Sequence, residues 1–354
     1  MTLASLHIIG GRELGGAERF YVRLVNALAA RSEPVAALTV AGGEIDAALN
    51  PAIPRHHAPM ASILDLWSRW QIRRVAQRYA IVQTYMGRAT RLTHLPAQGS
   101  VVHLARLGGY YNLKGYRHAH AWVGNTRGIR DYLVGEGLPA DRVFYIGNFV
   151  DPAPALAPAS LAELRQRWSI PQQARVLLGL GRLHPNKGFA DLLEAFARLP
   201  VQLDGRPLWL AMVGDGPLRD ELHALAGQLG ISGRVTWAGW QYDPAPWYQT
   251  AEVFVCPSRH EPLGNVVLEA WSNGVPVVST TAQGPVELIE SGVDGWLSPI
   301  GDPTVLAETL LSVLRLDDSH RAGLVAAGRR KLERDFSESA IVGAYLALYR
   351  QLCA

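Results

Sequence analysis

Residues 3–31 read LASLHIIGGRELGGAERFYVRLVNALAAR and hold the pattern that decides the fold. Leu3–Ile9 is a short apolar run that predicts a buried strand, and Gly10–Gly16 predicts a tight turn. Ala17–Arg31 then repeats apolar side chains at helical spacing, which predicts a helix that packs on the strand. A strand, a glycine turn and a helix in this order begin a βαβ unit.

The same alternation continues along the whole chain. Further apolar runs that predict strands are Val35–Val40, Ile81–Tyr85, Val101–Leu104, Ala121–Gly124, Val143–Ile146, Val176–Leu180, Leu208–Val213, Val235–Ala238, Val253–Cys256 and Val277–Thr280. Strands that are apolar throughout and separated by helices predict parallel sheets covered on both faces. The fold class is therefore α/β, with two doubly wound, Rossmann-like domains.

The domain boundary is expected at Asp151–Pro158, a proline-rich stretch (DPAPALAP) that reads as a semi-rigid linker. Residues 1–150 would form the first domain and residues 151–337 the second. A helix over about 338–354 is expected to pack back on the first. In open parallel sheets of this kind, ligands bind beyond the carboxyl ends of the strands.

The composition is that of an ordinary globular protein and not of a disordered one. The chain has 354 residues, 48% hydrophobic and 18% charged, and its two cysteines, Cys256 and Cys353, cannot form a disulfide framework. No signal peptide or membrane-spanning run is visible, so we expect a cytoplasmic protein; peripheral contact with the cytoplasmic face of the membrane stays open. The first 150 residues hold 17 Lys and Arg against 9 Asp and Glu, a net +8, and the remainder holds 17 against 22, a net −5. A basic first domain suits an anionic acceptor or membrane, or reflects solvated helix faces.

Three segments carry candidate chemistry. Arg259–Trp271 (RHEPLGNVVLEAW) places Glu261 before a helix expected to open near Gly264–Asn265, with Glu269 inside it; the helix N–H groups would face sugar or phosphate oxygens. Gly179–Gly188 follows a strand and offers Arg182 and Lys187 to one anion. Gly10–Glu18 would let the backbone approach a phosphate at Gly15 and Gly16, but it lacks the dinucleotide fingerprint. Each alone also fits a capped helix or a tight turn.

Together these motifs resemble the retaining glycosyltransferases of the GT-B fold, family 4, also known as group 1. The resemblance covers nearly the whole chain and rests on GGAE at Gly15–Glu18, GNFVD at Gly147–Asp151, GRLHPNKG at Gly181–Gly188, VGDGP at Val213–Pro217, PSRHEPLG at Pro257–Gly264, GVPVV at Gly274–Val278 and ELIESGVDGWL at Glu287–Leu297.

The resemblance implies a role for each matching position. Arg182 and Lys187 would hold the donor diphosphate, Glu261 would face the transferred sugar, and Glu269 would bind the ribose hydroxyls. The remaining donor positions are Gly15 and Gly16 at the diphosphate, backbone groups of Leu263, Gly264 and Asn265 at the sugar and phosphate, and Trp240 within Gly239–Gln241 at the base.

The implied reaction transfers a sugar from a nucleotide-diphosphate sugar, with UDP or GDP as the nucleotide, to a glycan or glycolipid acceptor with anomeric retention. No acidic pair for a metal is evident, so no metal cofactor is expected and the two cations would stabilise the leaving phosphate. Cell-envelope polysaccharide or lipopolysaccharide synthesis would be the setting. No nucleic-acid partner is expected.

The acceptor side departs from the family pattern. The usual DVVHxH stretch reads AIVQTY at Ala80–Tyr85. His103 is expected at a strand end where the family often places an active-site histidine, although a half-buried strand histidine fits as well. Arg88 and Arg106 are candidates for an anionic acceptor, or solvated side chains.

Ser62–Tyr79 (SILDLWSRWQIRRVAQRY) is basic and amphipathic. It would either dock on an anionic membrane or pack its Leu, Trp and Val side chains onto the sheet as an ordinary helix.

Other functions remain open on the same fold. A nucleotide-sugar epimerase or a phosphorylase would share the architecture, but no pyridoxal-phosphate lysine can be identified for the latter. An inactive glycosyltransferase-like partner subunit is disfavoured, because Arg182, Lys187, Glu261 and Glu269 are all present.

Overall fold

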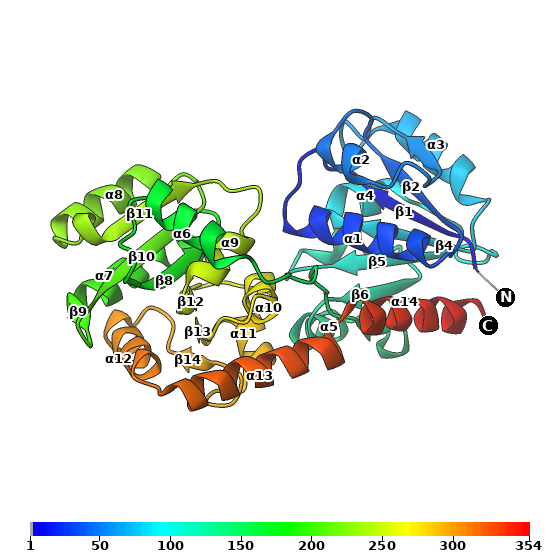
Figure 1. Cartoon of the computed structure of the whole chain (residues 1–354). Coiled ribbons are helices and arrows are strands. Elements are labelled where there is room, and N and C mark those ends of the chain that lie inside the picture. Colours follow the sequence, from blue (N-terminus) through cyan, green and yellow to red (C-terminus); the bar gives the residue numbers. More distant parts are fainter. Residues whose placement is uncertain (1–2) are drawn as a thin grey trace. The chain divides into compact units, whose positions relative to one another are not determined.

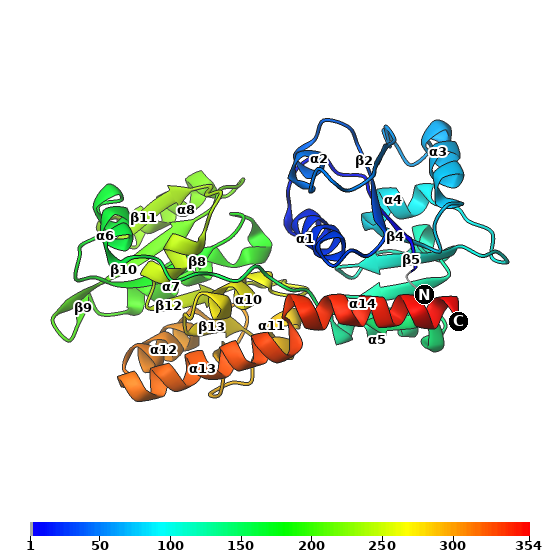
Figure 2. The ribbon, with the colours of Figure 1, turned by 45° about the vertical axis from the view of Figure 1, so that its right-hand side comes forward.

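The computed structural model describes residues 3–354, which divide into two compact units. The first unit comprises the chain up to Phe149 together with Phe336–Ala354, and the second comprises Val150–Asp335. Figures 1 and 2 show the carboxyl-terminal helix, in red, lying along the blue and cyan unit that begins at the amino terminus. None of the helices in the described part of the chain has the length and apolarity that a membrane crossing requires.

The first unit is built on a parallel sheet with the strand order β3-β2-β1-β4-β5-β6-β7. Its strands are β1 (Ser5–Ile9), β2 (Val35–Thr39), β3 (Arg55–His57), β4 (Ile81–Tyr85), β5 (Val102–Leu107), β6 (Ala121–Gly124) and β7 (Val143–Tyr145). Its helices are α1 (Gly16–Ala30), α2 (Glu44–Ala48), α3 (Leu66–Ala76), α4 (Met86–Leu92), α5 (Arg127–Gly135) and α14 (Glu338–Cys353), with 3₁₀ turns η1 (Leu113–Gly115) and η2 (Ala140–Arg142). Buried residues of α1 and α14 cover one face of the sheet, and those of α3, α4 and α5 cover the other.

The second unit repeats this architecture with the order β11-β10-β8-β12-β13-β14, and β9 pairs antiparallel with β10. Its strands are β8 (Arg175–Leu180), β9 (Gln202–Leu203), β10 (Arg206–Val213), β11 (Val235–Gly239), β12 (Val253–Cys256), β13 (Val277–Thr280) and β14 (Trp296–Ser298). Its helices are α6 (Pro158–Arg167), α7 (Phe189–Arg198), α8 (Arg219–Gln228), α9 (Ala245–Thr250), α10 (Asn265–Ser272), α11 (Gln283–Leu288), α12 (Pro303–Leu314) and α13 (Asp318–Asp335), with 3₁₀ turns η3 (Pro185–Lys187) and η4 (Ser232–Arg234).

A polar network is buried in the core of the first unit beneath α14. The Tyr349 hydroxyl donates to Oε1 of Gln83 at 2.6 Å, and Nε2 of Gln83 donates to the Tyr85 hydroxyl at 2.6 Å. The Tyr85 proton is therefore free to bond Nδ1 of His7, 2.9 Å away, which requires that nitrogen to be an acceptor. Nε2 of His7 lies 3.3 Å from the Ser5 hydroxyl. The network holds His7 neutral, and its complete burial lowers its pKa from 6.5 to about 3.

This neutral histidine makes the stability of the first unit depend on pH. The unfolded chain binds a proton at His7 below about pH 6.5, whereas the folded chain does not until about pH 3. The free energy of unfolding should therefore fall by about 1.4 kcal/mol per pH unit for this residue as the pH is lowered from about 6 to 4. His7→Gln keeps a polar side chain but cannot titrate. It should therefore reduce the slope of unfolding free energy against pH by the contribution of one proton, about 1.4 kcal/mol per pH unit. Urea unfolding at several pH values measures this slope. An unchanged slope would show that His7 is not held neutral.

Candidate functional site

The second unit places its candidate residues at a topological switch point. The chain runs from β8 outward to β10 on one side of the sheet, whereas β12 pairs with β8 on the other side. The loops that follow β8 and β12 therefore leave in opposite directions, which is where open α/β sheets bind ligands. Arg182 and Lys187 follow β8, and Glu261 follows β12.

Glycine lets these two loops meet backbone to backbone. Gly188 has a φ of +63°, and a Cβ built there would lie 2.0 Å from the carbonyl oxygen of Pro257. The N–H groups of Arg259 and His260 both donate to the carbonyl of Asn186, at 2.8 and 3.0 Å. Any side chain at position 188 would thus separate the loops.

The contact brings Lys187 and Glu261 together as an ion pair. Nζ of Lys187 lies 2.5 Å from Oε2 of Glu261, which also accepts a hydrogen bond of 3.2 Å from the Ser258 hydroxyl. Glu261 is buried and Lys187 half-buried. Burial lowers the pKa of Lys187, but the charge of Glu261, the nearby Cys256 and the hydrogen bond to Glu261 together outweigh that effect. The pKa therefore lies above its usual value, and the lysine is charged at neutral pH.

Helix α10 opens beside this pair, as predicted. Gly264 is its N-cap residue with a φ of +92°, and as a glycine it supplies no side-chain cap to the helix. Glu269 lies inside the helix and its Oε2 accepts a hydrogen bond of 3.1 Å from the buried Tyr248 hydroxyl. Gly284 fixes the loop before the helix, because its N–H donates to the carbonyl of Glu261 at 2.8 Å and a Cβ there would lie 2.2 Å from the carbonyl oxygen of Leu263.

Backbone hydrogen bonds also join the loop after β8 to the loop after β10, and that loop to the end of β11. The N–H of Leu183 donates to the carbonyl of Asp215 at 3.0 Å, and the N–H of Gly214 donates to the carbonyl of Gly239 at 2.8 Å. This chain of contacts leads to Trp240, whose side chain is exposed. Arg182 also has an exposed side chain. Lys187 and Glu261 form one ion pair at this edge, and Arg259 forms another with Asp191 at 2.6 Å.

In the first unit the predicted glycines begin α1. Gly15 is the N-cap residue and Gly16 the first residue of the helix. The carboxylate of Glu18 accepts hydrogen bonds from the N–H groups of Gly15 and Glu18, while burial raises its pKa. Arg88 extends Nη1 to the carbonyl oxygens of Gly10 at 3.2 Å and Met60 at 3.4 Å.

The expected placement of His103 is wrong. Strand β5 begins at Val102 and ends at Leu107, so His103 lies at the amino end of the strand and not at the carboxyl edge. It is completely buried, Nε2 lies 3.0 Å from the Thr84 hydroxyl, and burial lowers its pKa well below the usual value. Strand β5 continues to Leu107, so the carboxyl edge of the sheet lies beyond the predicted strand end at Leu104.

Arg106 is also not a solvated side chain. It is buried, Nε donates to the Tyr345 hydroxyl at 3.1 Å, and Nη2 bonds Oδ1 of Asn148. Its guanidinium lies 4.1 Å from the centre of the Phe20 ring. These contacts make Arg106 a link between β5, α1 and α14.

Sequence reasoning missed several residues of these edges. Ser258 and Tyr248 hold the two glutamates. Ser258 lies within the PSRHEPLG motif but was assigned no role, and Tyr248 belongs to no recognisable spacing. Met86, directly after β4, has a φ of +65°, a strained conformation for a side-chain-bearing residue that only coordinates reveal. Gly284 in the stretch AQGP was the one detectable signal, because a glycine next to proline marks a special backbone position.

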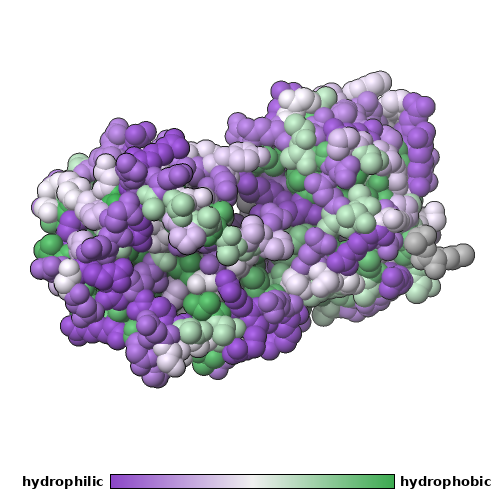
Figure 3. Space-filling model, in the orientation of Figure 1, coloured by the Kyte–Doolittle hydropathy of each residue, from purple (hydrophilic) through white to green (hydrophobic). Residues whose placement is uncertain are grey.

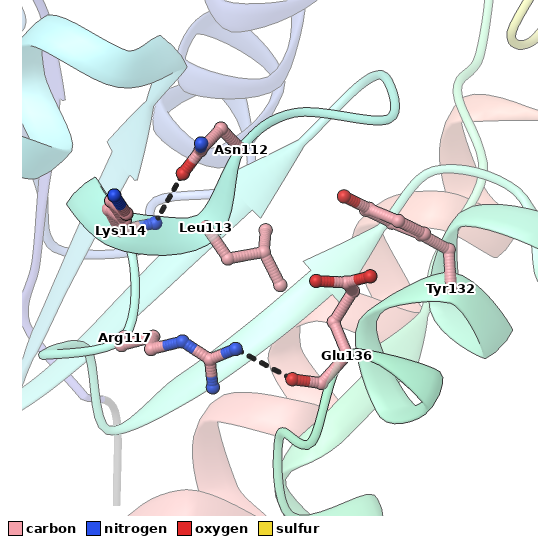
Figure 4. Close-up of a pocket in the computed structure, with 6 residues that line it drawn as sticks. All are labelled: Asn112, Leu113, Lys114, Arg117, Tyr132 and Glu136. Carbon is pink, nitrogen blue, oxygen red and sulfur yellow. Dashed lines mark hydrogen bonds between the residues drawn. The ribbon is translucent and has the colours of Figure 1, made fainter.

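A separate pocket of about 490 Å³ lies in the first unit between η1 and α5 (Figure 4). It is lined by Asn112, Leu113, Lys114, Arg117, Tyr132 and Glu136. Arg117 Nη2 donates to the carbonyl of Glu136 at 2.7 Å across its wall. None of the predicted site residues lines this pocket, so it is not the candidate site.

Comparison with known proteins supports the fold and the kind of enzyme. The family described as "Glycosyl transferases group 1" matches residues 161–331. The lipopolysaccharide core biosynthesis glycosyltransferase LpsE of Rhizobium meliloti is 37% identical over 341 residues, covering 94% of this chain and 95% of the relative. LpsD of the same organism is 34% identical over 349 residues, covering 97% of each.

Solved structures share the architecture. Anabaena Alr3699/HepE in complex with UDP and glucose superposes with a TM-score of 0.84 at 21% identity, covering 99% of this chain and 100% of that one. WaaG, a glycosyltransferase involved in lipopolysaccharide biosynthesis, does so with a TM-score of 0.75 at 19% identity, covering 98% and 99%. Together with the two parallel, doubly wound sheets, these matches confirm the predicted GT-B fold.

The glycine contact can be tested with a matched pair of variants. Gly188→Ala and Gly205→Ala both place alanine at a positive φ, +63° and +73°, but only at Gly188 does the new Cβ meet another atom within 4 Å. We expect Gly205→Ala to cost about 1–2 kcal/mol of unfolding free energy from backbone strain. Gly188→Ala should cost about 1–3 kcal/mol more, because the two loops must separate. If chemical unfolding shows that the two variants lose equal amounts of unfolding free energy, the close approach of Gly188 to Pro257 is contradicted.

Proposed function

Because this chain belongs to the group 1 glycosyl transferases, we propose that it transfers a sugar from a nucleotide-diphosphate sugar to a glycan or glycolipid acceptor with retention of anomeric configuration. The observation that carries the proposal is the pairing of Lys187 with Glu261 beside the start of α10, at the switch point of the second sheet. Cationic, acidic and N–H groups there suit a ligand that combines phosphate with sugar hydroxyls.

Each residue then has a part in holding the donor. Lys187 and Arg182 bind the diphosphate, and the N–H groups of Gly264 and Asn265, with the backbone of Leu263, reach the sugar and its phosphate. Glu261 accepts hydrogen bonds from the hydroxyls of the transferred sugar. Glu269, held by Tyr248, accepts those of the ribose. Trp240 completes the contacts of this unit, at the base.

The chemical step follows from where negative charge develops. The bond between the sugar C1 and the diphosphate oxygen breaks, leaving oxocarbenium character on the sugar and a full charge on the nucleoside diphosphate. Lys187, Arg182 and the start of α10 stabilise that leaving group. The acceptor hydroxyl attacks C1 from the same face and passes its proton to an oxygen of the leaving phosphate. Glu261 orients the sugar, and the two cations supply the charge that a metal ion would otherwise provide.

Relatives guide the choice of donor and acceptor. HepE, which shares the fold, has been crystallised with UDP and glucose, so UDP-hexoses are the first donors to test and GDP-hexoses the second. LpsE and LpsD act in lipopolysaccharide core biosynthesis, which favours a lipid-linked core saccharide as the acceptor. Arg88, at the carboxyl edge of the first sheet, is the basic residue we assign to the acceptor side. The enzyme would work in the cytoplasm, where peripheral contact with the inner membrane would present that acceptor.

The donor assignment is tested by nucleotide binding and product analysis. A ligand present at 100 times its dissociation constant stabilises the folded protein by about 2.7 kcal/mol. We expect UDP or GDP, but not a nucleoside alone, to raise the melting temperature accordingly. Transfer to deacylated core oligosaccharide should give the same anomer as the donor in the proton spectrum of the product. An inverted anomer would refute the retaining reaction.

The role of Lys187 can be separated from its structural contribution. Lys187→Ala should lower kcat about 100- to 1,000-fold, the effect of removing one contact to the charge of a transition state. Lys331→Ala is the matched control, because Nζ of Lys331 pairs with Asp294 in the same unit at 2.7 Å and with similar burial. Both variants lose an ion pair, but only the first should lose turnover. Similar kcat values for the two would remove Lys187 from the site.

A further inference from the structure

The first unit exposes a cluster of large apolar side chains around the start of α3. Ile63, Leu64, Leu66, Trp67 and Trp70, here called the α3 apolar patch, are 42%, 75%, 74%, 59% and 50% exposed. Five of the fourteen exposed large hydrophobic residues in the described chain thus fall within eight positions. On the one face that Figure 3 draws, hydrophobic residues are interspersed among hydrophilic ones. A contiguous apolar cluster of this kind marks an interaction surface.

The helix is fixed so that these side chains cannot turn inward. Asp65 caps α3 by accepting hydrogen bonds from the N–H and hydroxyl of Ser68, at 2.9 and 2.7 Å. The Ser68 hydroxyl in turn accepts from the N–H of Met60 at 2.9 Å. Ser68, Ile72 and Ala76 form the narrow buried side of the helix. The alternative that the helix packs its Leu, Trp and Val side chains onto the sheet is therefore wrong for the leucines and tryptophans, whereas the half-buried Val75 does pack against the core.

Positive charge lies on the same outer side. At about 100° per residue, Leu66, Trp67, Trp70, Arg73 and Arg74 fall within an arc of about 120° on the side opposite the buried residues. Both arginines are exposed, and the Arg74 guanidinium lies 5.4 Å from the centre of the Trp70 ring. The Trp67 and Trp70 rings stack at 5.0 Å.

The net positive charge of this segment indicates an anionic partner. Ser62–Tyr79 holds four arginines and one acid, Asp65, which is occupied as the helix cap. Tryptophan and leucine flanked by arginine suit the boundary between acyl chains and anionic headgroups. There the apolar side chains leave water and the guanidinium groups are attracted to the negative headgroups. We propose that the α3 apolar patch, with Arg73 and Arg74, docks this protein on an anionic lipid bilayer.

The docking surface is joined to the acceptor side of the same unit. Met60 immediately precedes the segment that carries the patch, and its carbonyl accepts from Nη1 of Arg88, which also bonds the carbonyl of Gly10 in the loop after β1. A bilayer held at α3 would present a lipid-linked acceptor near these loops. The inference assigns a surface to the membrane contact of the proposed function, and its test is independent of the sugar transfer because binding is measured without donor or acceptor.

The experiment is flotation of the full-length protein with vesicles of phosphatidylcholine alone or with 30% phosphatidylglycerol. We expect binding to the anionic vesicles, with weakening at high salt. Trp67→Ala with Trp70→Ala should reduce binding at least tenfold. Arg73→Gln with Arg74→Gln should reduce it about 25-fold, at roughly fivefold per arginine near an anionic surface.

Matched controls lie in the second unit. Arg315→Gln with Arg330→Gln removes two exposed charges, and Val201→Ala trims an exposed apolar side chain; both should bind like the wild type. Because the patch side chains are exposed, melting temperatures of all variants should stay close to the wild-type value. The proposal is overturned if the wild type does not float with anionic vesicles or if the tryptophan variant binds unchanged. It is also overturned if gel filtration shows that the patch instead joins two copies of the chain and no vesicle binding occurs.

Discussion

The close approach of Gly188 to the carbonyl of Pro257 is the constraint on which the candidate site depends. Two loops that leave a switch point in opposite directions have no reason to touch unless a residue without a side chain lets them. Once they touch, the N–H groups of Arg259 and His260 bond Asn186, and Lys187 comes within hydrogen-bond distance of Glu261. Gly284 permits a similar close approach one loop further along the chain, to the carbonyl oxygen of Leu263. Backbone contacts, rather than long side chains, therefore set the geometry of this edge.

The first unit has the same topology but secures its elements differently. Its core contains hydrogen-bonded polar groups, with His7, Gln83, Tyr85 and Tyr349 in one network and Arg106 in another. Such groups are costly to bury unless every partner is present, so they fix the position of α14 more specifically than apolar packing would. A carboxyl-terminal helix held in this way stabilises the unit to which the amino terminus belongs.

Most strands could be predicted from the sequence to within a few residues, because a short, continuous apolar run between glycine turns and helices is typical of a strand buried on both faces. Three strands were missed: β3, whose residues Arg55–His57 are all polar, and the very short strands β9 and β14, which are two and three residues long. Glu261 and Glu269 were correctly placed before and inside a helix, since proline and glycine mark where that helix begins. His103 and Arg106 were misjudged because strand ends and the burial of a cation depend on partners distant in sequence, namely Thr84, Tyr345 and Asn148.

The ion pair of Lys187 with Glu261 also constrains what can bind there. Each group satisfies the other while largely removed from water, and separating them without replacement would leave a buried, uncompensated charge. An anion alone could take over Lys187 but would leave Glu261 with only the Ser258 hydroxyl and a new negative neighbour. A ligand that brings phosphate to the lysine and hydroxyl donors to the carboxylate satisfies both groups at once. Discrimination of this kind arises from the penalty for the group left unpaired, which is larger than the gain from either contact alone.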